Sequence, residues 1–281
     1  MKWENFFVQG SGDAMITSMT NQKVKRIVQL NKKAALRNKE DVFVAEGVKM
    51  FLEAPKEDLE EIYVAENFPL FSERQEDRGA AVIQKLEACG YETVAEEVFG
   101  KMSDTQSPQG ILCVVRQRHY SLEDMLGRKE NPLFIVLENL QDPGNLGTIF
   151  RSGEAAGVCG VVMSKDTADV YNPKVIRATM GSVYRMPFHY AEDLEEAIGK
   201  MKKAGTEVFA AHLRGEKSYG KCDYRKASAF LIGNEGNGLT ERTAALADTY
   251  VKIPMEGKVE SLNAAVAAAV LIFEAARQRR E

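Results

Sequence analysis

The fold of this chain is decided by its C-terminal stretch, residues 251–280, which reads VKIPMEGKVESLNAAVAAAVLIFEAARQRR. The stretch begins as a short extended run at residues 251–255 and continues as a polar loop. Ser261 then has the small hydroxyl side chain that is preferred at a helix N-cap, so we expect a helix over residues 262–278. Five alanines between residues 264 and 269 leave little side chain on this helix, which predicts close packing on more than one side.

Two earlier stretches have the composition of loops that follow strands. They read ENLQDPGNLGTIFRS at residues 138–152 and FLIGNEGNGL at residues 230–239. Short apolar runs alternate with helical patterns in this half of the chain, which implies a largely parallel sheet covered on both faces. Ligands bind such sheets at the carboxyl ends of the strands, and all three stretches are expected there.

The length of 281 residues suggests one or two domains. We expect residues 15–118 to form a small α/β domain, residues 119–131 to form a charged and polar linker, and residues 132–281 to form a second α/β domain. Residues 1–14 precede the patterned sequence and are interpreted as an extension.

Composition excludes several classes of protein. Apolar residues make up 44% and charged residues 28%, as in soluble globular proteins, and no apolar run reaches the length of about 18 residues that a membrane span needs. The N-terminus lacks the pattern of a secretory signal, so we expect a cytoplasmic protein with no membrane partner. The four cysteines form no CxxC and the three histidines lie outside the Gly/Asn-rich loops, so we expect reduced thiols and no metal site.

The net charge of −4 hides a basic segment between residues 20 and 39. Its apolar residues recur at helical spacing, which predicts a helix with one packed face and a basic remainder. Two interpretations stay open: a solvated surface helix, and contact with the phosphates of a polyanion. The seven basic residues of this segment, which contains no acid, are Lys23, Lys25, Arg26, Lys32, Lys33, Arg37 and Lys39.

The loops lack two common nucleotide-binding motifs. There is no GxGxxG after the first strand and no GxxxxGK[ST], so neither a dinucleotide site nor a P-loop is supported. The run from Gly233 to Gly238 can present backbone N–H groups to a ligand, although Gly/Asn runs are more often plain turns. Arg151 follows Asn145 by about one and a half helical turns, and a surface ion pair is its simplest explanation.

Taken together, the three stretches resemble the three motifs of the SpoU/TrmH family of RNA ribose 2′-O-methyltransferases, within the SPOUT class. Residues 139–151 resemble the first motif, residues 231–236 the second, and residues 253–263 the third. The segment YNPK at residues 171–174, together with residues 177–181, is similar to the family's sequence between the first two motifs. The resemblance covers residues 132–281, and residues 15–118 more loosely resemble the family's RNA-binding N-terminal domain.

This resemblance implies a fold and a cofactor. In the family the C-terminal chain is threaded into a deep trefoil knot, and S-adenosylmethionine binds in the knot largely through backbone groups. By position, the cofactor contacts here are Gly233, Ile253 and Leu262, with Asn234 and Met255 near. The resemblance also implies a homodimer that shares its RNA site. The two-domain layout favours ribosomal RNA over transfer RNA as the substrate, and no DNA partner is expected.

The resemblance assigns the central catalytic role to Arg151. A guanidinium normally stays protonated, so we prefer Arg151 as a phosphate anchor and stabiliser of alkoxide charge rather than as a base. Asn145 is then expected to orient the substrate or Arg151, and Glu235 to accept from Arg151 or the ribose. Ser261 and Asn263 are expected to fix the third loop and the hydroxyl, although Glu235 and Asn263 are also plausible as capping residues.

Two other functions stay open beside the methyltransferase. One is a non-catalytic RNA-binding protein on the same fold, and the other is an enzyme that uses a different nucleotide on an α/β sheet. The intact motif residues disfavour the first, and the missing Rossmann and P-loop patterns disfavour the second. The candidate RNA contacts are Lys23, Arg26, Lys33, Arg37, Lys174 and Arg177.

Overall fold

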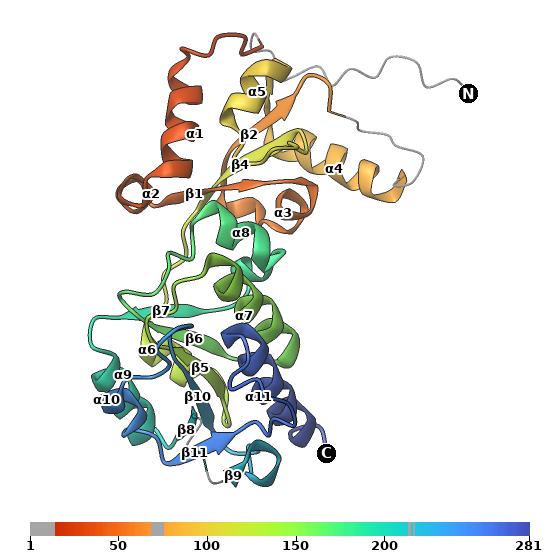
Figure 1. Cartoon of the computed structure of the whole chain (residues 1–281). Helices are drawn as coiled ribbons and strands as arrows, with labels where there is room; N and C mark the ends of the chain where they lie inside the picture. The colour runs from red at the N-terminus through yellow and green to blue at the C-terminus, as the bar shows by residue number, and fades with distance from the viewer. Residues whose placement is uncertain (1–14, 69–75, 213–214, 216) are drawn as a thin grey trace. The chain divides into compact units, whose positions relative to one another are not determined.

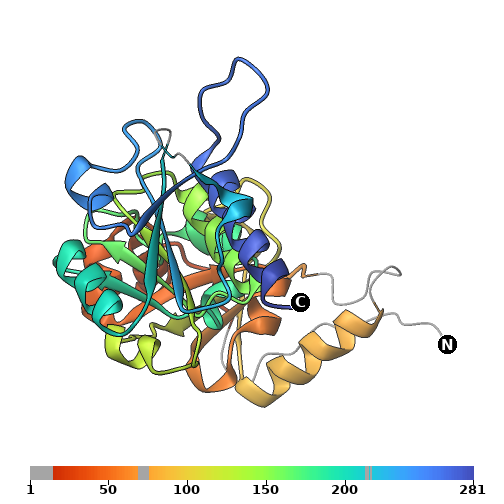
Figure 2. The same ribbon diagram turned by 90° about the horizontal axis from the view of Figure 1, so that it is seen from below.

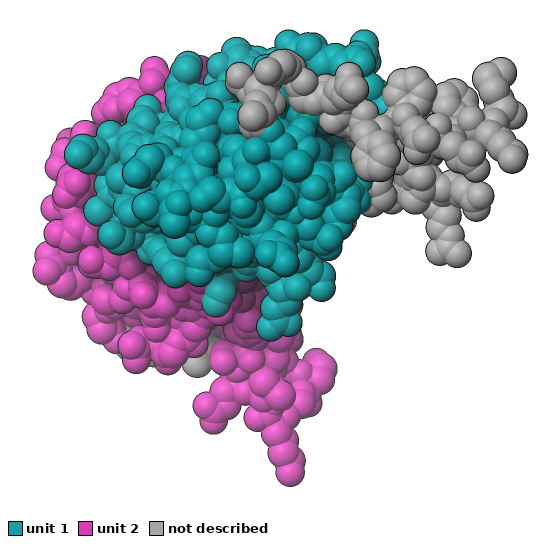
Figure 3. Space-filling model, turned by 90° about the horizontal axis from the view of Figure 1, so that it is seen from above, with its two compact units in different colours: residues 1–117, 171–184 teal, residues 118–170, 185–281 magenta. Residues whose placement is uncertain are grey.

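The computed structural model describes residues 15–68, 76–212, 215 and 217–281. The chain divides into two compact units, which Figure 3 shows in different colours. Unit 1 comprises the chain up to Gln117 together with Tyr171–Tyr184, and unit 2 comprises Arg118–Val170 and Arg185–Glu281. The extension expected at residues 1–14 lies outside the described residues.

Unit 1 is built on a mixed sheet with the strand order β1-β4-β2-β3 (Figure 1). Strand β4 runs antiparallel to both of its neighbours, and β2 and β3 are parallel. The strands are β1 (Val42–Glu46), β2 (Leu59–Ala65), β3 (Glu92–Val94) and β4 (Ile111–Arg116). The helices are α1 (Gln22–Lys32), α2 (Ala34–Glu40), α3 (Val48–Glu53), α4 (Glu76–Cys89), α5 (Glu96–Met102) and α8 (Pro173–Thr179).

Helix α1 follows the pattern predicted for the basic segment. Its cap is Asn21, whose side chain accepts a hydrogen bond from the backbone N–H of Lys23 at 2.8 Å. Val24, Ile27 and Leu30 recur at helical spacing and are buried in the core of unit 1. The basic side chains are therefore distributed over the remaining faces of the helix.

Unit 2 is built on a sheet that is parallel throughout, with the strand order β7-β6-β5-β10-β8-β11-β9. Its strands are β5 (Leu133–Leu137), β6 (Gly160–Ser164), β7 (Phe188–Ala191), β8 (Glu207–Ala211), β9 (Lys217–Ser218), β10 (Ser228–Ile232) and β11 (Thr249–Lys252). Its helices are α6 (Leu122–Leu126), α7 (Pro143–Ala156), α9 (Leu194–Lys203), α10 (Glu241–Ala244) and α11 (Ala264–Gln278). None of the helices in the described part of the chain has both the length and the apolar character that a membrane crossing requires.

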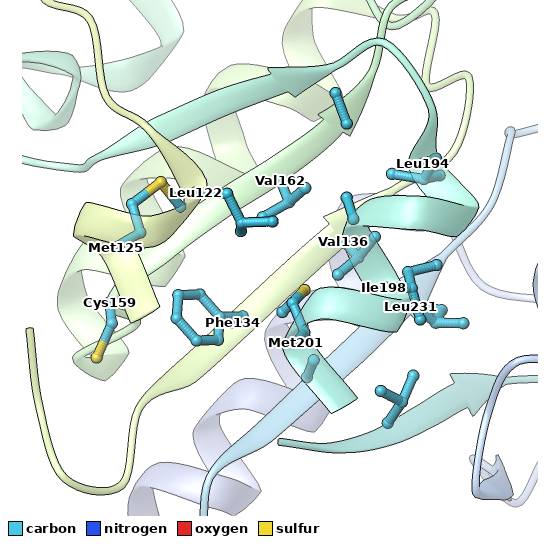
Figure 4. Close-up of a cluster of buried hydrophobic side chains, with 14 of the residues drawn as sticks. Leu122, Met125, Phe134, Val136, Cys159, Val162, Leu194, Ile198, Met201 and Leu231 are labelled. Atoms are coloured by element: carbon cyan, nitrogen blue, oxygen red, sulfur yellow. The ribbon is translucent and has the colours of Figure 1, made fainter. Parts of the chain in front are cut away.

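The sheet of unit 2 is covered on both faces, as strand–helix alternation predicts. On one face, α6 and α9 pack onto β5, β6 and β10, and Phe134, Val162 and Leu231 belong to this apolar cluster (Figure 4). On the other face, α7 and α11 pack against each other and lie side by side (Figure 1). The sites at the carboxyl ends of β5, β10 and β11 therefore rest on a buried, rigid sheet.

The expected linker at residues 119–131 proved to be part of unit 2. It contains α6, which is capped by Ser121, and Leu122 and Met125 are buried in the core of the unit. These two apolar residues are three positions apart and so lie on one face of the short helix. Because charged residues surround them, this buried pair was not recognised in the sequence.

The segment Tyr171–Tyr184 also differs from the expected division, because it groups with unit 1. Helix α8 packs on β1, and the ring of Tyr171 stacks on Phe43 with a centroid separation of 4.7 Å. In addition, the Arg177 guanidinium pairs with the Asp104 carboxylate at 3.0 Å. A segment that lies between two strands of unit 2 in the sequence thus belongs structurally to the smaller unit.

Helix α11 begins at Ala264, two residues later than expected, and its cap is Asn263 rather than Ser261. The Asn263 side-chain oxygen accepts from the backbone N–H groups of Ala265 and Val266 at 2.9 and 3.2 Å. Asn and Ser are comparable N-caps, so the choice between them is made by the tertiary contacts of Asn263. Ser261 consequently stays in the loop between β11 and α11, which extends beyond the body of unit 2 (Figure 2).

The far end of α11 is tied to the segments that lead into β5 and β10. The Arg279 guanidinium donates to the carbonyls of Asn131 and Tyr224 at 2.6 and 2.7 Å. Gln278 donates to the Cys222 carbonyl at 3.0 Å and accepts from the Tyr224 N–H at 2.9 Å. The helix is therefore fixed at both ends.

The alanine-rich helix is closely packed on one side only within this chain. Ala268 is fully buried, whereas Val266 is 48% exposed. We expect Ala268→Leu to lower the free energy of unfolding by about 1–3 kcal/mol, because three added carbons must displace packed neighbours. Ala81→Leu on α4 is the matched control, and its effect should be close to zero because Ala81 is exposed and Ala and Leu have similar helix propensities. Equal melting temperatures for the two variants would contradict this account of the helix.

Candidate functional site

Glu235 connects the loop after β10 to the start of α7. One carboxylate oxygen accepts from the Asn145 side-chain amide at 3.0 Å and from the Asp142 backbone N–H at 2.9 Å. The other oxygen accepts from the Gln141 backbone N–H at 3.1 Å. These charge-assisted bonds join the second motif-like stretch to the first.

Asn145 extends this connection to the third stretch. Its side-chain oxygen accepts from the Asn263 amide at 2.9 Å, while its own amide donates to Glu235. The Asn263 oxygen in turn caps α11. Each amide uses its donor on one side and its acceptor on the other, so the bonds form a directed chain, which we call the Glu235–Asn145–Asn263 relay. It joins the segments that follow β5, β10 and β11.

Asn234 shapes the loop beside the relay. Its side-chain oxygen accepts from the backbone N–H groups of Gly236 and Asn237 at 2.9 and 3.1 Å. Its amide donates to the carbonyl of Asn139 at 2.8 Å. The loop after β10 is therefore held both by itself and by the loop after β5.

A cavity of about 390 Å³ lies at the carboxyl ends of β8, β10 and β11. All five predicted cofactor contacts line it, and so do Glu235 and Ser261. The five are Gly233, Asn234, Ile253, Met255 and Leu262. The structure thus brings the predicted binding residues together around one space.

The shape of this cavity depends on Gly233. A Cβ atom at this position would lie 2.1 Å from the carbonyl carbon of Gly238 and 2.2 Å from the nitrogen of Leu239. The two backbone segments approach so closely because Asn234 and Gly238 exchange two backbone hydrogen bonds, at 3.0 and 2.9 Å. Any larger residue at position 233 would push the wall of the cavity outward.

The cavity fits S-adenosylmethionine as the cofactor. Its volume lies within the range of about 300–1,000 Å³ typical of small-molecule sites. The wall is rich in glycine and in backbone groups, with apolar side chains from Ile253, Met255 and Leu262. A ligand with an adenine ring and several hydrogen-bonding groups suits such a lining.

Sequence reasoning missed much of the rest of the cavity wall, including three residues outside the motif-like stretches. His212 follows β8 at the same edge of the sheet, and Ala264 and Ala267 are on the first turn of α11. The position of His212 after a parallel strand is a signal that could have identified it. The two alanines follow from the predicted close packing of the helix, because small side chains leave room for a ligand.

Arg151 does not line this cavity. It is exposed on α7, and it has no ion pair among the residues that the structure describes. Because it follows Asn145 by six residues, it points about 120° away from Asn145 around the helix axis. The structure therefore separates Arg151 from the relay of its own chain.

Among the candidate RNA contacts in the basic segment, the structure contradicts the prediction for Arg37. It is only 3% exposed, and its guanidinium donates to the carbonyls of Leu30 and Asn31 at 2.6 and 3.3 Å. These carbonyls belong to the last turn of α1, where a cation is stabilising. Arg37 therefore caps a helix and is not accessible to a phosphate.

Two other candidates in this segment are engaged in ion pairs. Lys23 lies 2.6 Å from the Glu92 carboxylate, and Arg26 pairs with Glu40 at 2.7 Å and with Glu61 at 3.0 Å. Their charges are partly neutralised within unit 1. A charge pattern cannot reveal such pairing, because the acidic partners are distant in the sequence.

The exposed basic surface consists mainly of other lysines. Lys25, Lys32, Lys33 and Lys39 are exposed, and none has an ion-pair partner in the described part of the chain. Only Lys33 was among the predicted contacts. The other three could have been found by placing them on the faces of the helices opposite the apolar positions. On α8, Lys174 is likewise exposed, whereas Arg177 pairs with Asp104.

Comparison with known proteins agrees with this geometry. Residues 132–273 match the SpoU rRNA Methylase family, and residues 21–113 match the MRM3-like substrate binding domain. The chain belongs to the SpoU rRNA methylase family. It is 31% identical to the 23S rRNA (guanosine(2553)-2′-O)-methyltransferase RlmP of Bacillus subtilis, over 92% of this chain and 97% of that protein.

Solved structures of similar methyltransferases have the same fold. An AdoMet-bound rRNA methyltransferase from Sinorhizobium meliloti aligns with a TM-score of 0.78 at 32% identity, over 94% of this chain and 97% of that one. The SpoU methyltransferase AviRb from Streptomyces viridochromogenes, in complex with AdoMet, aligns with a TM-score of 0.81 at 25% identity, over 93% and 99%. The predicted α/β fold with a parallel sheet is confirmed.

Hydrogen bonding in this SpoU family member holds the pKa of Glu235 below its ordinary value. Partial burial alone would raise the pKa, but the bonds from Asn145, Gln141 and Asp142 outweigh that effect. A carboxylate with a lowered folded-state pKa contributes stability above its unfolded pKa, and that contribution is lost as the pH falls through the folded value.

We therefore expect the stabilisation by Glu235 to depend on pH. At pH 7 the Glu235→Gln variant should have a lower melting temperature than the parent. The difference between the two melting temperatures should narrow as the pH falls below the unfolded pKa of about 4.3. Glu256→Gln is the control, because the Glu256 carboxylate is exposed and has no hydrogen-bond partner in the described residues. A gap that stays constant from neutral to acidic pH would show that the carboxylate charge does not hold the loops.

Proposed function

We propose that this SpoU family member transfers a methyl group from S-adenosylmethionine to a ribose 2′-hydroxyl of ribosomal RNA. The observation that carries the proposal is the convergence of three loops, joined by the Glu235–Asn145–Asn263 relay, on one cavity of suitable size. The relatives named as 23S rRNA 2′-O-methyltransferases and the AdoMet-bound structures support the substrate and the cofactor.

The cofactor assignment is tested by calorimetric titration with S-adenosylmethionine, NAD and ATP. Only S-adenosylmethionine should bind, and labelled methyl groups should then appear on ribosomal RNA. Binding of NAD or ATP instead would favour an enzyme that uses another nucleotide. RNA binding without any cofactor binding would favour a non-catalytic protein on the same fold.

The reaction makes limited demands on the protein. Bound in the cavity, S-adenosylmethionine supplies an electrophilic methyl group on a positively charged sulfur. The leaving thioether is neutral, so no protein group has to protonate it. The residues must hold the ribose hydroxyl in line with the methyl group and assist the loss of the hydroxyl proton.

Glu235 is suited to positioning rather than to proton transfer. Both of its carboxylate oxygens already accept hydrogen bonds from the start of α7, and the same bonds lower its pKa. A weakly basic, fully engaged carboxylate is a poor general base. We assign Glu235, Asn145 and Asn263 to the alignment of the loops. Ser261, which lines the cavity, is the residue that orients the ribose hydroxyl.

We further propose that α11 is threaded through the chain as a trefoil knot. It is the next element after β11, from which the loop at residues 253–263 separates it. It packs on β10 and α7 and is tied at both ends by Asn263 and Arg279. Knots are among the rarest topologies. A knotted α11 explains why small side chains line the cavity, because a loop must close around the helix.

A second copy of the chain completes the proposed site. Val266 and Phe273 are seven residues apart on the same face of α11, and they are 48% and 45% exposed. Helix α7 packs against α11 and carries the exposed Arg151. Pairing of two copies through this apolar face would cover it and would place Arg151 of one copy at the cavity of the other. There the guanidinium would bind RNA phosphate and stabilise the forming alkoxide.

The proposed substrate is ribosomal rather than transfer RNA, and the proposed place of action is the cytoplasm, where ribosomes are assembled. The support is the match of residues 21–113 to a substrate binding domain and the exposed lysines of α1 and α2. These lysines can neutralise phosphates although the net charge of the chain is −4.

The exposed lysines predict a salt-dependent effect. Changing Lys25, Lys32 and Lys33 together to Gln should weaken binding of a 23S rRNA transcript. The salt slope should fall by about 0.7 for each phosphate of a single strand that the variant no longer neutralises. Turnover at saturating RNA should hardly change. The control is the triple variant Lys129→Gln, Lys203→Gln and Lys221→Gln, which removes the same charge from exposed sites. Identical slopes for the two variants would mean that α1 is only a solvated surface helix.

The proposed role of Arg151 predicts that Arg151→Ala nearly abolishes methyl transfer and leaves the affinity for S-adenosylmethionine within a few-fold of the parent. Single-turnover rates and calorimetry measure the two quantities. Arg242→Ala, which removes an exposed guanidinium from α10, is the control. Retention of most single-turnover activity by Arg151→Ala would rule out the assigned role.

Sharing of the site between two copies predicts complementation. Arg151→Ala and Gly233→Leu should each be inactive alone, and a mixed dimer of the two should regain activity at one of its sites. That site would combine the intact cavity of one subunit with Arg151 of the other. A mixed dimer without activity would place Arg151 in the site of its own chain.

A further inference from the structure

Unit 1 contains a pocket of its own, with a volume of about 160 Å³. Its wall is formed by the turn between β1 and α3, the loop that precedes β4, and the end of α8. The volume is well below the range of about 300–1,000 Å³ for cofactor-sized ligands, so the pocket suits one base or a similarly small group.

The turn and the loop are locked together at Gly47 and Gln109. Gly47 has a φ of 108°, and a Cβ at this position would lie 2.8 Å from the Gln109 side-chain oxygen. That oxygen accepts from the backbone N–H of Val48 at 3.2 Å. The bond fixes which end of the amide faces the turn. The Gln109 amide nitrogen is left as a donor with no acceptor in the described part of the chain.

The acidic group of the pocket is already satisfied by the protein. The Glu46 carboxylate accepts from the hydroxyls of Ser103 and Thr105 at 2.8 and 2.9 Å, and from the Asp104 N–H at 3.3 Å. These bonds hold the loop that precedes β4 against the end of β1. The carboxylate is therefore held in place by the protein, and it shapes the pocket.

Two cations and an exposed apolar side chain complete the wall. Among the described residues, Lys49 is held only by a 3.6 Å ion pair with Glu53, and Arg177 pairs with Asp104 at the surface. Met180 is 38% exposed and has a φ of 52°, a left-handed backbone conformation that is unusual for a residue other than glycine. This conformation ends α8, of which Met180 is the C-cap. The methionine side chain adapts well to flat apolar partners.

We infer that this pocket binds a single unpaired nucleotide of the substrate RNA. The base would lie against Met180, with an acceptor on its edge toward the Gln109 amide and the Ser107 hydroxyl. Lys49 and Arg177 would face the neighbouring phosphates. The inference rests on the proposed function only in taking RNA as the substrate.

The wall of this pocket comes from both regions that match family models. Arg177 and Met180 belong in sequence to the region that matches the SpoU rRNA Methylase family, yet they line a pocket of the smaller unit. The residues opposite them come from the region that matches the substrate binding domain. The pocket is thus a specificity determinant built from both matched regions, and it selects which RNA is presented for methylation.

The test is Gln109→Glu, which keeps the acceptor for Val48 and replaces the amide donor with a negative oxygen. Binding of a 23S rRNA transcript to the full chain should weaken about tenfold, as expected for loss of a hydrogen bond at a charged site. Gln106→Glu is the matched control, because Gln106 is exposed in the same loop and does not line the pocket. Thermal melts of both variants establish that the fold is unchanged.

A second variant tests the apolar contact. Met180→Ala should raise the KM for the transcript several-fold with little change in kcat, whereas Met19→Ala, at another exposed methionine of unit 1, should change neither. If Gln109→Glu and Gln106→Glu bind the transcript equally well while the parent methylates it, the pocket inference is wrong and the proposed function stands. If the parent neither binds nor methylates the transcript, the proposed function fails and the inference fails with it.

Discussion

The arrangement of three loops in unit 2 depends on one carboxylate. Glu235 accepts from the start of α7, and Asn145 passes the connection to Asn263, which caps α11. Without the relay, the bond from Asn234 to the Asn139 carbonyl would still join the loops after β5 and β10, but the hydrogen bond between Asn145 and Asn263 would be lost. Linked hydrogen bonds reinforce one another, so the loss of one member is expected to loosen all three loops.

The relay also explains why few polar side chains of the three loops are free to contact a ligand. The groups that line the cavity are mainly backbone and small or apolar side chains, and the polar residues of the three loops are largely occupied with one another. Arg151, the proposed catalytic cation, is on the exposed face of α7. In the proposed dimer, a second copy of the chain supplies the cation that the relay residues do not provide.

The meeting of the three loops could be predicted from the sequence, because loops that follow parallel strands lie at one edge of the sheet. The roles expected of their residues came from the resemblance to the SpoU/TrmH motifs. The parts that could not be predicted depend on tertiary partners. Ser261 and Asn263 are equally good caps, and only the contact of Asn263 with Asn145 decides between them. Arg37 has the same charge as its neighbours, but its guanidinium is buried against the backbone carbonyls at the C-terminal end of α1. The segment Tyr171–Tyr184 joins unit 1 through contacts that no local pattern encodes.

The most direct test of the relay is a double-mutant cycle between Asn145→Ala and Asn263→Ala, read as the single-turnover rate of methyl transfer to a 23S rRNA transcript. The two side chains lie 2.9 Å apart and neither lines the cavity. The account predicts that the double variant is hardly slower than the more impaired single variant, with a coupling energy of about 0.5–3 kcal/mol. If the increases in activation free energy of the two single variants add up to that of the double variant, as for independent sites, the account is wrong.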